Sequence, residues 1–442
     1  MKKNPKSIKS SLIRTLEDVA KSKVEYCLRP EHDFLRKRKL NFLDVLKIII
    51  GLNAGNLSNE LIDATKDKCN IPTTSAFVQA RSKIDPRVFK DILTKFTEKH
   101  IDDKTQDMTV LAIDGSDVRY HANPDDTLCY FPGVNGQKHY NLVHVNALYD
   151  INNEIYRDVL IQQTKEANEH LALQKFVHTS TIKKALLIAD RGYESYNNMA
   201  HIQKKGWFYL IRIKDGACGM KAGYDLPKTD EFDIELKVNF TRKQTNEVKR
   251  LIKENKNSYK YVSKHETFDF LPPNRKKSDP AIFYEIDFRM VRLKISENEY
   301  ETVVTNLDKN EYTPDKLKEL YASRWGIETS FRSLKYTVGM LNFHTKKLMC
   351  VKQEIYANMI MYNFTKLITK VIPIAANKNR KHKYKHDFTV AVHMCRLLFK
   401  GLSTSKSVET TIARNVMPVR ADRHYIRRNS SPQMRYLNNR VA

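Results

Sequence analysis

The sequence lacks any apolar run of about 18 residues, the length that a helix needs to cross a bilayer, so we expect no membrane span. The first residues, MKKNPKSIKSSLIRTLEDVAKS, begin with basic side chains but contain neither an apolar core nor a cleavage site. A signal peptide is therefore not expected at this end. The chain also shows no internal repeat, which argues against a solenoid.

Cysteine is sparse, and its spacing excludes two further classes. No two cysteines form a C-x-x-C pair, so a zinc site or a disulfide framework is not expected. Scattered cysteines without a pairing pattern are most simply explained by a protein of the reducing cytoplasm. The six residues are Cys27, Cys69, Cys129, Cys218, Cys350 and Cys395.

Acidic residues are in the minority. The 442 residues contain 77 Lys and Arg against 51 Asp and Glu, a formal net charge of +26. Residues 377–442 hold 15 basic against 3 acidic side chains, and residues 1–40 hold 12 against 5. Such an excess favours a polyanionic partner, because each neutralised phosphate releases counterions. The alternative is a surface that serves solubility only.

The chain is 41% hydrophobic, as in a globular protein, and changes character several times along its length. Residues 1–105 read as a helical N-terminal domain, with LNFLDVLKIIIGL at helical spacing. We expect Thr74 or Ser75 to cap a second helix there, and Asp85-Pro86 to break it. DNA binding and dimerisation both remain open for this domain.

Residues 106–214 have a different pattern. MTVLAIDG, LVHVNALYD and IYRDVLIQQ are strand-like, and NEHLALQKFVHTS is helical. The buried strand KALLIADRG, a second helix and the strand WFYLIRIK follow. Three strands, helix, strand, helix, strand is the order of a ribonuclease-H-like core, so we predict an α/β fold whose core begins here.

The remaining segments complete this organisation. Residues 215–305 carry short alternating runs and are expected to be a β-rich insertion. Residues 306–376 would return to the catalytic core, through a long helix with Thr313 as N-cap and Pro314 at its first position. Residues 377–442 form a basic, mostly helical C-terminal region. In it we expect a basic linker at 377–386, FTVAVHMCRLLFKGL as the last core helix, and a tail from about 412.

Two aspartates stand where apolar strands are expected to end. Asp114 in VLAIDGSDVR and Asp190 in ALLIADRGY each follow an apolar run, with a glycine within two positions. One such Asp is most simply a turn residue. Two Asp carboxylates at the ends of adjacent strands repel each other, and a bound divalent cation usually offsets this repulsion. Asp117 is a rival for the first position, but on an extended strand it would face the opposite side.

A third carboxylate, Glu328, lies among basic and aromatic side chains in YASRWGIETSFRSLK. At about 100° per residue, four side chains fall within an arc of about 60° on one helix. Trp325 and Arg332 flank that arc. An ordinary surface ion pair at i,i+4 is the alternative. The four residues of the arc are Tyr321, Arg324, Glu328 and Lys335.

Three carboxylates beside cations suit phosphoryl transfer on DNA. Two divalent ions roughly 4 Å apart activate the attacking oxygen and stabilise the leaving one. Mg²⁺ prefers a few protein oxygens together with water and phosphate, so Asp114, Asp190 and Glu328 would suffice as ligands. The neighbouring Tyr, Arg and Lys would hold phosphates without reading sequence.

These residues resemble a known family. Y-x2-R-x3-E-x6-K matches, without departure, the signature of the insertion-sequence DDE transposases often called the IS-four family. IDGS around Asp114 and ADRGY around Asp190 resemble the blocks that carry that family's two Asp residues. Asp190 lies 76 residues after Asp114, and Glu328 a further 138 residues on, because the family carries a β-rich insertion there. The resemblance covers residues 105–345.

The resemblance implies a transposase that moves its own element by cut and paste, using two Mg²⁺ or Mn²⁺ ions. It implies a bacterial, nucleoid-associated protein that binds terminal inverted repeats and target DNA as a homodimer. Water would free a 3′-OH, which attacks the opposite strand to give a hairpin. Asp114, Asp190 and Glu328 would hold the metal, and Tyr321, Arg324 and Lys335 would contact phosphates near a flipped base.

Several questions stay open from the sequence. A flipped base needs a stacking surface, for which Trp325, Trp207, Phe268 and Phe270 are all candidates. His139 and His144 should face opposite sides of a strand and serve the core or a phosphate. Glu166 and Glu169 are interpreted as acids that complement a helix dipole. The competing functions are a ribonuclease-H-like nuclease without strand transfer and a silent, domesticated DNA-binding protein.

Overall fold

The computed structural model describes residues 4–36, 39–65, 70–101, 107–133, 136, 138–216, 219–273, 280–374 and 382–419. Residues 377–381 of the expected basic linker, and the expected tail from residue 420 on, lie outside these ranges. Within them, no helix combines the length and the apolar character that crossing a membrane requires. The four cysteines described, Cys27, Cys129, Cys350 and Cys395, are buried and unbridged.

A mixed sheet runs through the molecule, in the order β2-β3-β1-β5-β6-β10-β9-β7-β8, with β4 paired to β3. β1 is antiparallel to β3 and parallel to β5, and β5 is parallel to β6. The predicted order of three strands, helix, strand, helix, strand is therefore observed. These elements are β1 (Thr109–Tyr120), β3 (Tyr140–Asp150), β4 (Ile155–Gln163), α6 (Glu169–Thr179), β5 (Ala185–Ala189), α7 (Tyr196–Lys204) and β6 (Phe208–Ile213), with the short β2 (Tyr130–Phe131) beside β3.

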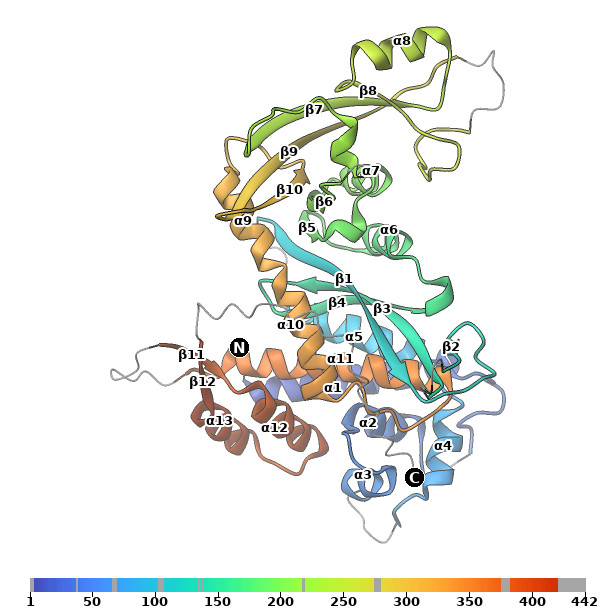
Figure 1. Ribbon diagram of the computed structural model, residues 1–442. Coiled ribbons are helices and arrows are strands. Elements are labelled where there is room, and N and C mark those ends of the chain that lie inside the picture. Colours follow the sequence, from blue (N-terminus) through green and yellow to red (C-terminus); the bar gives the residue numbers. More distant parts are fainter. Residues whose placement is uncertain are drawn as a thin grey trace.

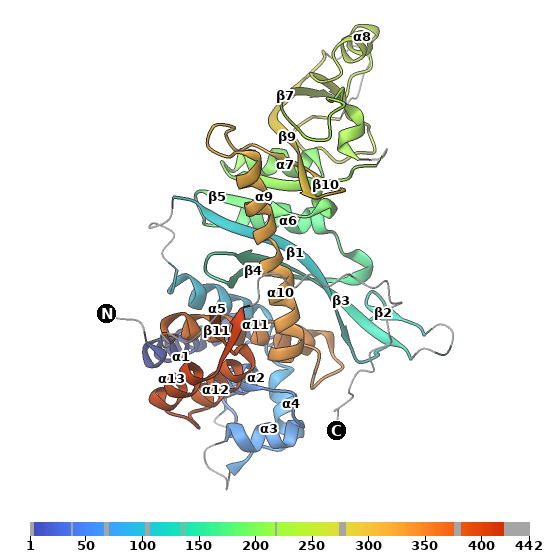
Figure 2. The same ribbon diagram turned by 60° about the vertical axis from the view of Figure 1, so that its left-hand side comes forward.

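The region expected to be β-rich does hold most of the remaining strands, and it extends the same sheet. β10 pairs with β6 and with β9, so the added strands continue the central sheet. Figures 1 and 2 show β7 and α8, and Figure 1 also β8, at the end of the molecule far from α1 (Pro5–Lys21), α2 (Phe42–Gly51) and α3 (Leu57–Ala64). The elements are β7 (Phe232–Thr241), α8 (Asn246–Glu254), β8 (Tyr259–Tyr261), β9 (Tyr284–Ser296) and β10 (Glu299–Thr305).

Helices cover both faces of the sheet because β1 alternates its side chains between two cores. Leu111 and Ile113 pack into the cluster that contains α6 and α7. Ala112 and Val118 pack into the cluster that contains α10 (Trp325–Ser333) and α11 (Leu348–Val371). α9 (Pro314–Ser323) and α10 cross the strands on this second face (Figure 1).

The N-terminal and C-terminal helices pack together around α11, and one hydrophobic cluster includes side chains from both ends of the chain. The expectation that residues 388–402 form the last helix is wrong, because α13 follows. Its N-cap is Thr404, whose hydroxyl accepts from the backbone N–H of Ser407 at 3.2 Å. The helices are α1 (Pro5–Lys21), α2 (Phe42–Gly51), α3 (Leu57–Ala64), α4 (Thr74–Arg81), α5 (Arg87–Glu98), α12 (Phe388–Lys400) and α13 (Ser405–Arg414).

Two further boundaries differ from expectation. Thr73, one position before the residues expected to cap α4, is the N-cap and accepts from the backbone N–H of Ala76 at 3.2 Å. The expected tail from about 412 starts too early, since α13 runs to Arg414. Next, β12 (Val416–Val419) pairs with β11 (Lys383–His386), which lies in the expected linker.

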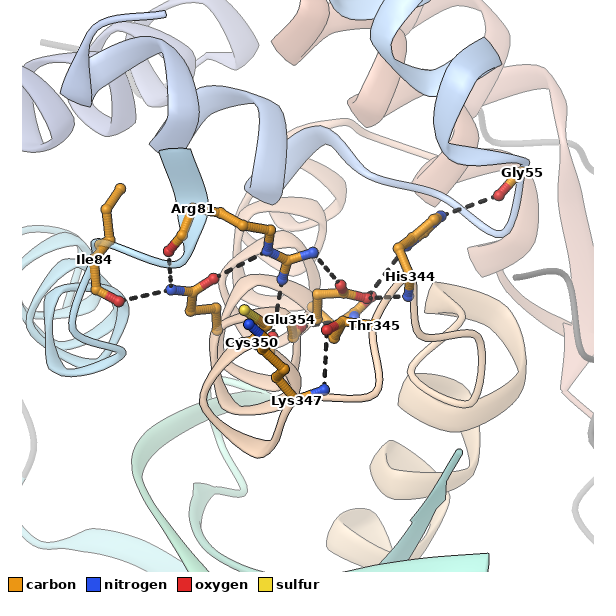
Figure 3. Close-up of polar contacts among 10 residues, drawn as sticks. Gly55, Arg81, Ile84, His344, Thr345, Lys347, Cys350 and Glu354 are labelled. Atoms are coloured by element: carbon orange, nitrogen blue, oxygen red, sulfur yellow. Dashed lines mark hydrogen bonds and ion pairs between the residues drawn. The ribbon is translucent and has the colours of Figure 1, made fainter. Parts of the chain in front are cut away.

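A buried polar network fixes α4 against α11 (Figure 3). The Arg81 guanidinium donates from Nη1 to Glu354 Oε1 at 2.7 Å, from Nε to Gln353 Oε1 at 3.2 Å and from Nη2 to the Cys350 carbonyl at 2.9 Å. His344 contacts the other Glu354 oxygen at 3.2 Å. Because its buried charges are paired and hydrogen-bonded, this network can hold the N-terminal helices in one position.

Candidate active site

Asp114 lies within β1, so the expectation that it ends the strand is wrong. β1 continues to Tyr120, and Gly115 pairs with Asn146 of β3 in the regular ladder. Antiparallel pairing with β3 keeps this segment extended, so Gly115 and Ser116 make no turn. The parallel pairing with β5, however, stops at Ala112 opposite Ile188. Asp114 therefore stands just beyond the point where β1 and β5 separate.

Asp190 directly follows β5, so it lies at the C-terminal end of the parallel β1–β5 pairing, as Asp114 does. Its Oδ1 accepts from the backbone N–H of Gly192 at 2.8 Å, which caps the 3₁₀ turn η4 (Arg191–Tyr193). Asp190 therefore serves as a turn residue, as expected of a single Asp after a strand. The residue also acts on Asp114: burial, and then the negative charge of Asp190, raise the pKa of the Asp114 carboxyl to about 7.

Glu328 of α10 belongs to the same group of charges. Its Oε1 accepts from Arg324 Nη2 at 2.7 Å. The Glu328 charge also raises the pKa of Asp114, whereas the Arg324 charge lowers it. β1, the end of β5 and α10 thus bring the three carboxylates close enough for the charges of Asp190 and Glu328 to act on Asp114.

The long helix expected to carry the signature is broken. α9 ends at Ser323, α10 begins at Trp325, and a π-helical turn, η6 (Leu334–Val338), follows α10. Thr313 stands at the N-cap of α9 with Pro314 next to it, but its side chain makes no capping hydrogen bond. The rotation of about 100° per residue expected along one long helix therefore applies only within each helical segment.

The basic and aromatic residues of the signature point in different directions. Tyr321 packs in a hydrophobic cluster with Leu317 and Leu210, and its hydroxyl has no hydrogen-bond partner among the described residues. The Arg324 guanidinium lies 5.5 Å from the centre of the Tyr321 ring. Lys335 Nζ donates to the backbone carbonyl of Asp117 at 2.7 Å. Arg324, next to the Tyr321 ring, is also paired with Glu328.

Two of the stacking candidates differ sharply in exposure. Trp207 is buried just before β6, and its Nε1 donates to the Ile182 carbonyl at 3.0 Å, so it is a core residue. Trp325 is 51% exposed, three positions before Glu328. Arg332 is exposed on the same helix. Phe268 is buried against Phe270. Among these four aromatics, Trp325 is the one exposed beside the carboxylates.

The donor set fits hard divalent cations by its chemistry. Carboxylate oxygens are the ligands that Mg²⁺ and Mn²⁺ prefer, and a cation between Asp114 and Asp190 would offset the repulsion that raises the Asp114 pKa. In the part of the chain that the structure describes, no three His, Cys, Asp or Glu side chains are arranged to hold a metal ion. Glu328 is instead directed to Arg324.

The structure links Glu169, His144 and Asp117, which the sequence offered no reason to connect. Glu169 stands in the first turn of α6, as expected of a helix N-terminal acid, yet its Oε1 lies 3.2 Å from His144 Nε2. His144 Nδ1 bonds to Asp117 Oδ1 at 2.8 Å. Burial would lower the pKa of His144, but the bonds to Asp117 and Glu169 raise it to about 9. Tyr193, in the block ADRGY, is buried nearby, but nothing in the sequence singled it out.

The comparisons now decide the family. Residues 105–364 match the family described as the transposase DDE domain, which is more than half of the chain. The chain belongs to this family. It is a DDE transposase, an enzyme of DNA transposition, and residues 105–364 span every strand of the central sheet and every carboxylate discussed above.

No curated protein matches the transposase. Among solved structures it is similar to the piggyBac transposase in a cryo-EM structure of its synaptic complex with hairpin DNA. The identity is 9% and the TM-score 0.43, over 95% of this chain and 87% of that one.

Proposed function

We propose that this DDE transposase performs cut-and-paste transposition of an insertion sequence of the IS-four type, with Asp114, Asp190 and Glu328 as its catalytic carboxylates. One observation carries the proposal: the charges of Asp190 and Glu328, from two separate elements, both act on the half-buried Asp114. Glu328 is in turn paired with Arg324. Structural ion pairs alone would not place a half-buried carboxyl under the influence of two others of its own charge.

The topology supports a ribonuclease-H-like core. In the run β4-β3-β1-β5-β6 the first three strands are antiparallel, and β5 and β6 are parallel to β1. Asp114 and Asp190 stand where β1 and β5 diverge, and Glu328 comes from α10. We keep the proposed division into an N-terminal helical domain at 1–105, core segments at 106–214 and 306–376, an insertion at 215–305 and a C-terminal region at 377–442.

The reaction is an in-line displacement at phosphorus. A water oxygen attacks, the bond from phosphorus to the 3′ oxygen breaks, and that oxygen leaves as a 3′-OH. The same hydroxyl then attacks the opposite strand to give a hairpin and, after reopening, the target DNA. Two Mg²⁺ or Mn²⁺ ions held by Asp114, Asp190 and Glu328 would supply Lewis-acid activation of both oxygens.

The side chains beside the carboxylates take roles in holding DNA. Arg324 orients Glu328 and is itself packed on the Tyr321 ring, so Tyr321 acts through Arg324. Lys335 and the exposed Arg332 are placed on successive turns and would contact phosphates. The exposed ring of Trp325 offers a stacking surface for a base turned out of the duplex.

Double-stranded DNA is the proposed partner, as terminal inverted repeats and as target. The net charge of +26 supports this, and the structural neighbour was solved with hairpin DNA. A homodimer that synapses two ends follows from the resemblance to the family. The two alternatives, a nuclease without strand transfer and a silent DNA-binding protein, differ from the proposal in their products.

The deciding experiment uses purified protein, Mg²⁺ and a labelled duplex ending in the inverted repeat that flanks the gene. We expect a nick that leaves a 3′-OH, then a hairpin, then joining to a target plasmid. Asp114→Ala, Asp190→Ala and Glu328→Ala should each abolish cleavage and keep DNA binding. Cleavage without any joined product would favour the nuclease, and binding without cleavage would favour the silent protein.

A further inference from the structure

Glu169 reaches from α6 to the glycines that lie beside both aspartates of the proposed site. A β-carbon added to Gly115, the residue after Asp114, would collide with Glu169 Oε1 and His144 Nε2. A β-carbon added to Gly192 would lie 3.0 Å from Asp190 Oδ1 and 3.5 Å from Glu169 Oε2. One oxygen of Glu169 therefore lies against the neighbour of Asp114, and the other against the loop that Asp190 caps.

The position of Glu169 is fixed by contacts outside its own helix. His144 of β3 stands between Asp117 Oδ1 at 2.8 Å and Glu169 Oε1 at 3.2 Å. The Glu169 contact is an ion pair rather than a well-directed hydrogen bond. Lys335, from the proposed DNA-holding helix, donates to the backbone of Asp117 at 2.7 Å. The two sides of the sheet are thus linked through Asp117.

A role limited to the helix dipole does not explain this placement. α6 already has an N-cap, because Asn168 Oδ1 accepts from the backbone N–H of Leu171 at 3.0 Å. Glu169 turns its carboxylate toward β1 and the Asp190 loop instead. Glu166, in the 3₁₀ turn η3 (Thr164–Glu166) just before the helix, is exposed, as an acid that serves only the dipole can be.

An independent feature points into the same space. The Tyr193 side chain is 1% exposed, and its hydroxyl has no hydrogen-bond partner among the described residues. After burial itself, the charges of Glu169, Asp114 and Asp190, in that order, raise the pKa of Tyr193. The charges of these three carboxylates, partly offset by that of Arg324, therefore act on the buried hydroxyl. A buried hydroxyl without a partner is costly, so a group bound there would satisfy it.

We propose that Glu169 is a fourth carboxylate of the metal centre, and that the Tyr193 hydroxyl positions it relative to Asp114 and Asp190. The inference rests on the proposed function, because it requires a divalent cation at the two aspartates. It also explains Gly115: any larger side chain would occupy the space where Glu169 meets His144. Tyr193 is a positioning residue here, since it acts through the carboxylates.

The test measures Mn²⁺ binding to the full-length protein without DNA, by electron paramagnetic resonance of free Mn²⁺. Glu169→Gln keeps the shape of the side chain, Glu166→Gln is the matched control, and Asp190→Asn tests the centre itself. We expect Glu169→Gln and Asp190→Asn each to weaken Mn²⁺ binding at least tenfold, with Glu166→Gln unchanged. Tyr193→Phe should weaken binding by about twofold to fivefold. Thermal unfolding in EDTA checks that each variant is folded.

The outcomes separate the two proposals. Parental Mn²⁺ affinity in Glu169→Gln, together with a loss in Asp190→Asn, would overturn the role of Glu169 and leave the metal centre standing. Parental affinity in both variants would overturn the metal centre as well. An equal loss in Glu166→Gln would show a general charge effect and would also overturn the specific role of Glu169.

Discussion

Arg324 and Glu328 form an ion pair of 2.7 Å, and both charges act on the half-buried Asp114. Arg324 is 7% exposed, and its guanidinium lies 5.5 Å from the centre of the Tyr321 ring and 6.0 Å from that of the Trp325 ring. This pair occupies an oxygen of the carboxylate proposed to bind metal. We therefore expect the loss of this pair to lower the rate of strand cleavage rather than the affinity for DNA.

Arg324→Ala should lower strand cleavage at saturating DNA by about 10²-fold, because one preorganised charge at a phosphoryl-transfer site is worth that much. Arg332→Ala removes an exposed arginine of the same helix and is the matched control. We expect Arg332→Ala to weaken DNA binding and to lower the slope of log affinity against log salt concentration by about one. The cleavage rate at saturating DNA should stay unchanged. Equal saturated rates for parent and Arg324→Ala would contradict the proposed role.

The exposed ring of Trp325 leads to a prediction about hairpin formation. Trp325→Ala should reduce hairpin yield and leave thermal stability almost unchanged, because stacking on a base is worth roughly 1–3 kcal/mol. Trp325→Phe keeps a stacking ring and should retain most of the yield. A fluorescent base analogue near the cleavage site reports base extrusion. Trp207→Ala, by contrast, should lower stability by about 3–5 kcal/mol, since that ring is buried.

The network in Figure 3 predicts that the N-terminal helices depend on one buried arginine. Arg81→Ala leaves Glu354 buried without its cation, which costs about 3–5 kcal/mol when one member of such a pair is removed. Urea unfolding measures this difference. Arg250→Ala breaks the exposed pair with Glu254 and should leave the unfolding midpoint unchanged. A similar midpoint for both variants would show that the network does not anchor α4.

The same network predicts how stability depends on pH. Burial would lower the pKa of His344, but its bonds to Glu354 and to the Gly55 carbonyl raise it above the usual value of 6.5. Protonated His344 therefore stabilises the fold fully below about pH 6.5, and this contribution is lost as the pH rises through the raised pKa. Glu354, whose pKa is lowered, adds stability that is lost only as the pH falls below about 4.5.

His344→Gln tests this pH window, because glutamine carries no charge at any pH. The difference in free energy of unfolding between the parent and His344→Gln should be larger at pH 5.5 than at pH 9. Measurements in EDTA avoid any contribution from bound metal. A difference that stays constant across this range would mean that the charge of His344 does not stabilise the packing of α4 on α11.

Local patterns in the sequence predicted much of the architecture. The order of strands and helices from β1 to β6 followed from runs of apolar residues, and Asp114, Asp190 and Glu328 were singled out by type and position. The extension of β1 beyond Asp114 was missed, because glycine and serine favour a turn locally, whereas pairing with β3 keeps them extended. Local propensity is regularly overridden by such pairing.

The contacts of Glu169 and Tyr193 could not be predicted, because they depend on how α6 packs across the sheet. In the sequence, Glu169 resembles any acid in the first turn of a helix that complements the helix dipole. Its position next to Gly115 of β1 is known only from the folded structure. Likewise, the exposure of Trp325 depends on what packs around α10, which the sequence alone does not show. Tertiary packing therefore decides which of several similar residues face the site.

The claim that the three carboxylates hold metal is tested most directly by changing one oxygen ligand to sulfur. Asp190→Cys offers a thiolate, which binds Mn²⁺ better than it binds Mg²⁺. We predict that Asp190→Cys fails to cleave the labelled terminal repeat with Mg²⁺ and regains measurable cleavage with Mn²⁺, while the parent cleaves with both. Cleavage by Asp190→Cys at the parental rate in Mg²⁺ would contradict the proposed role of Asp190 as a metal ligand.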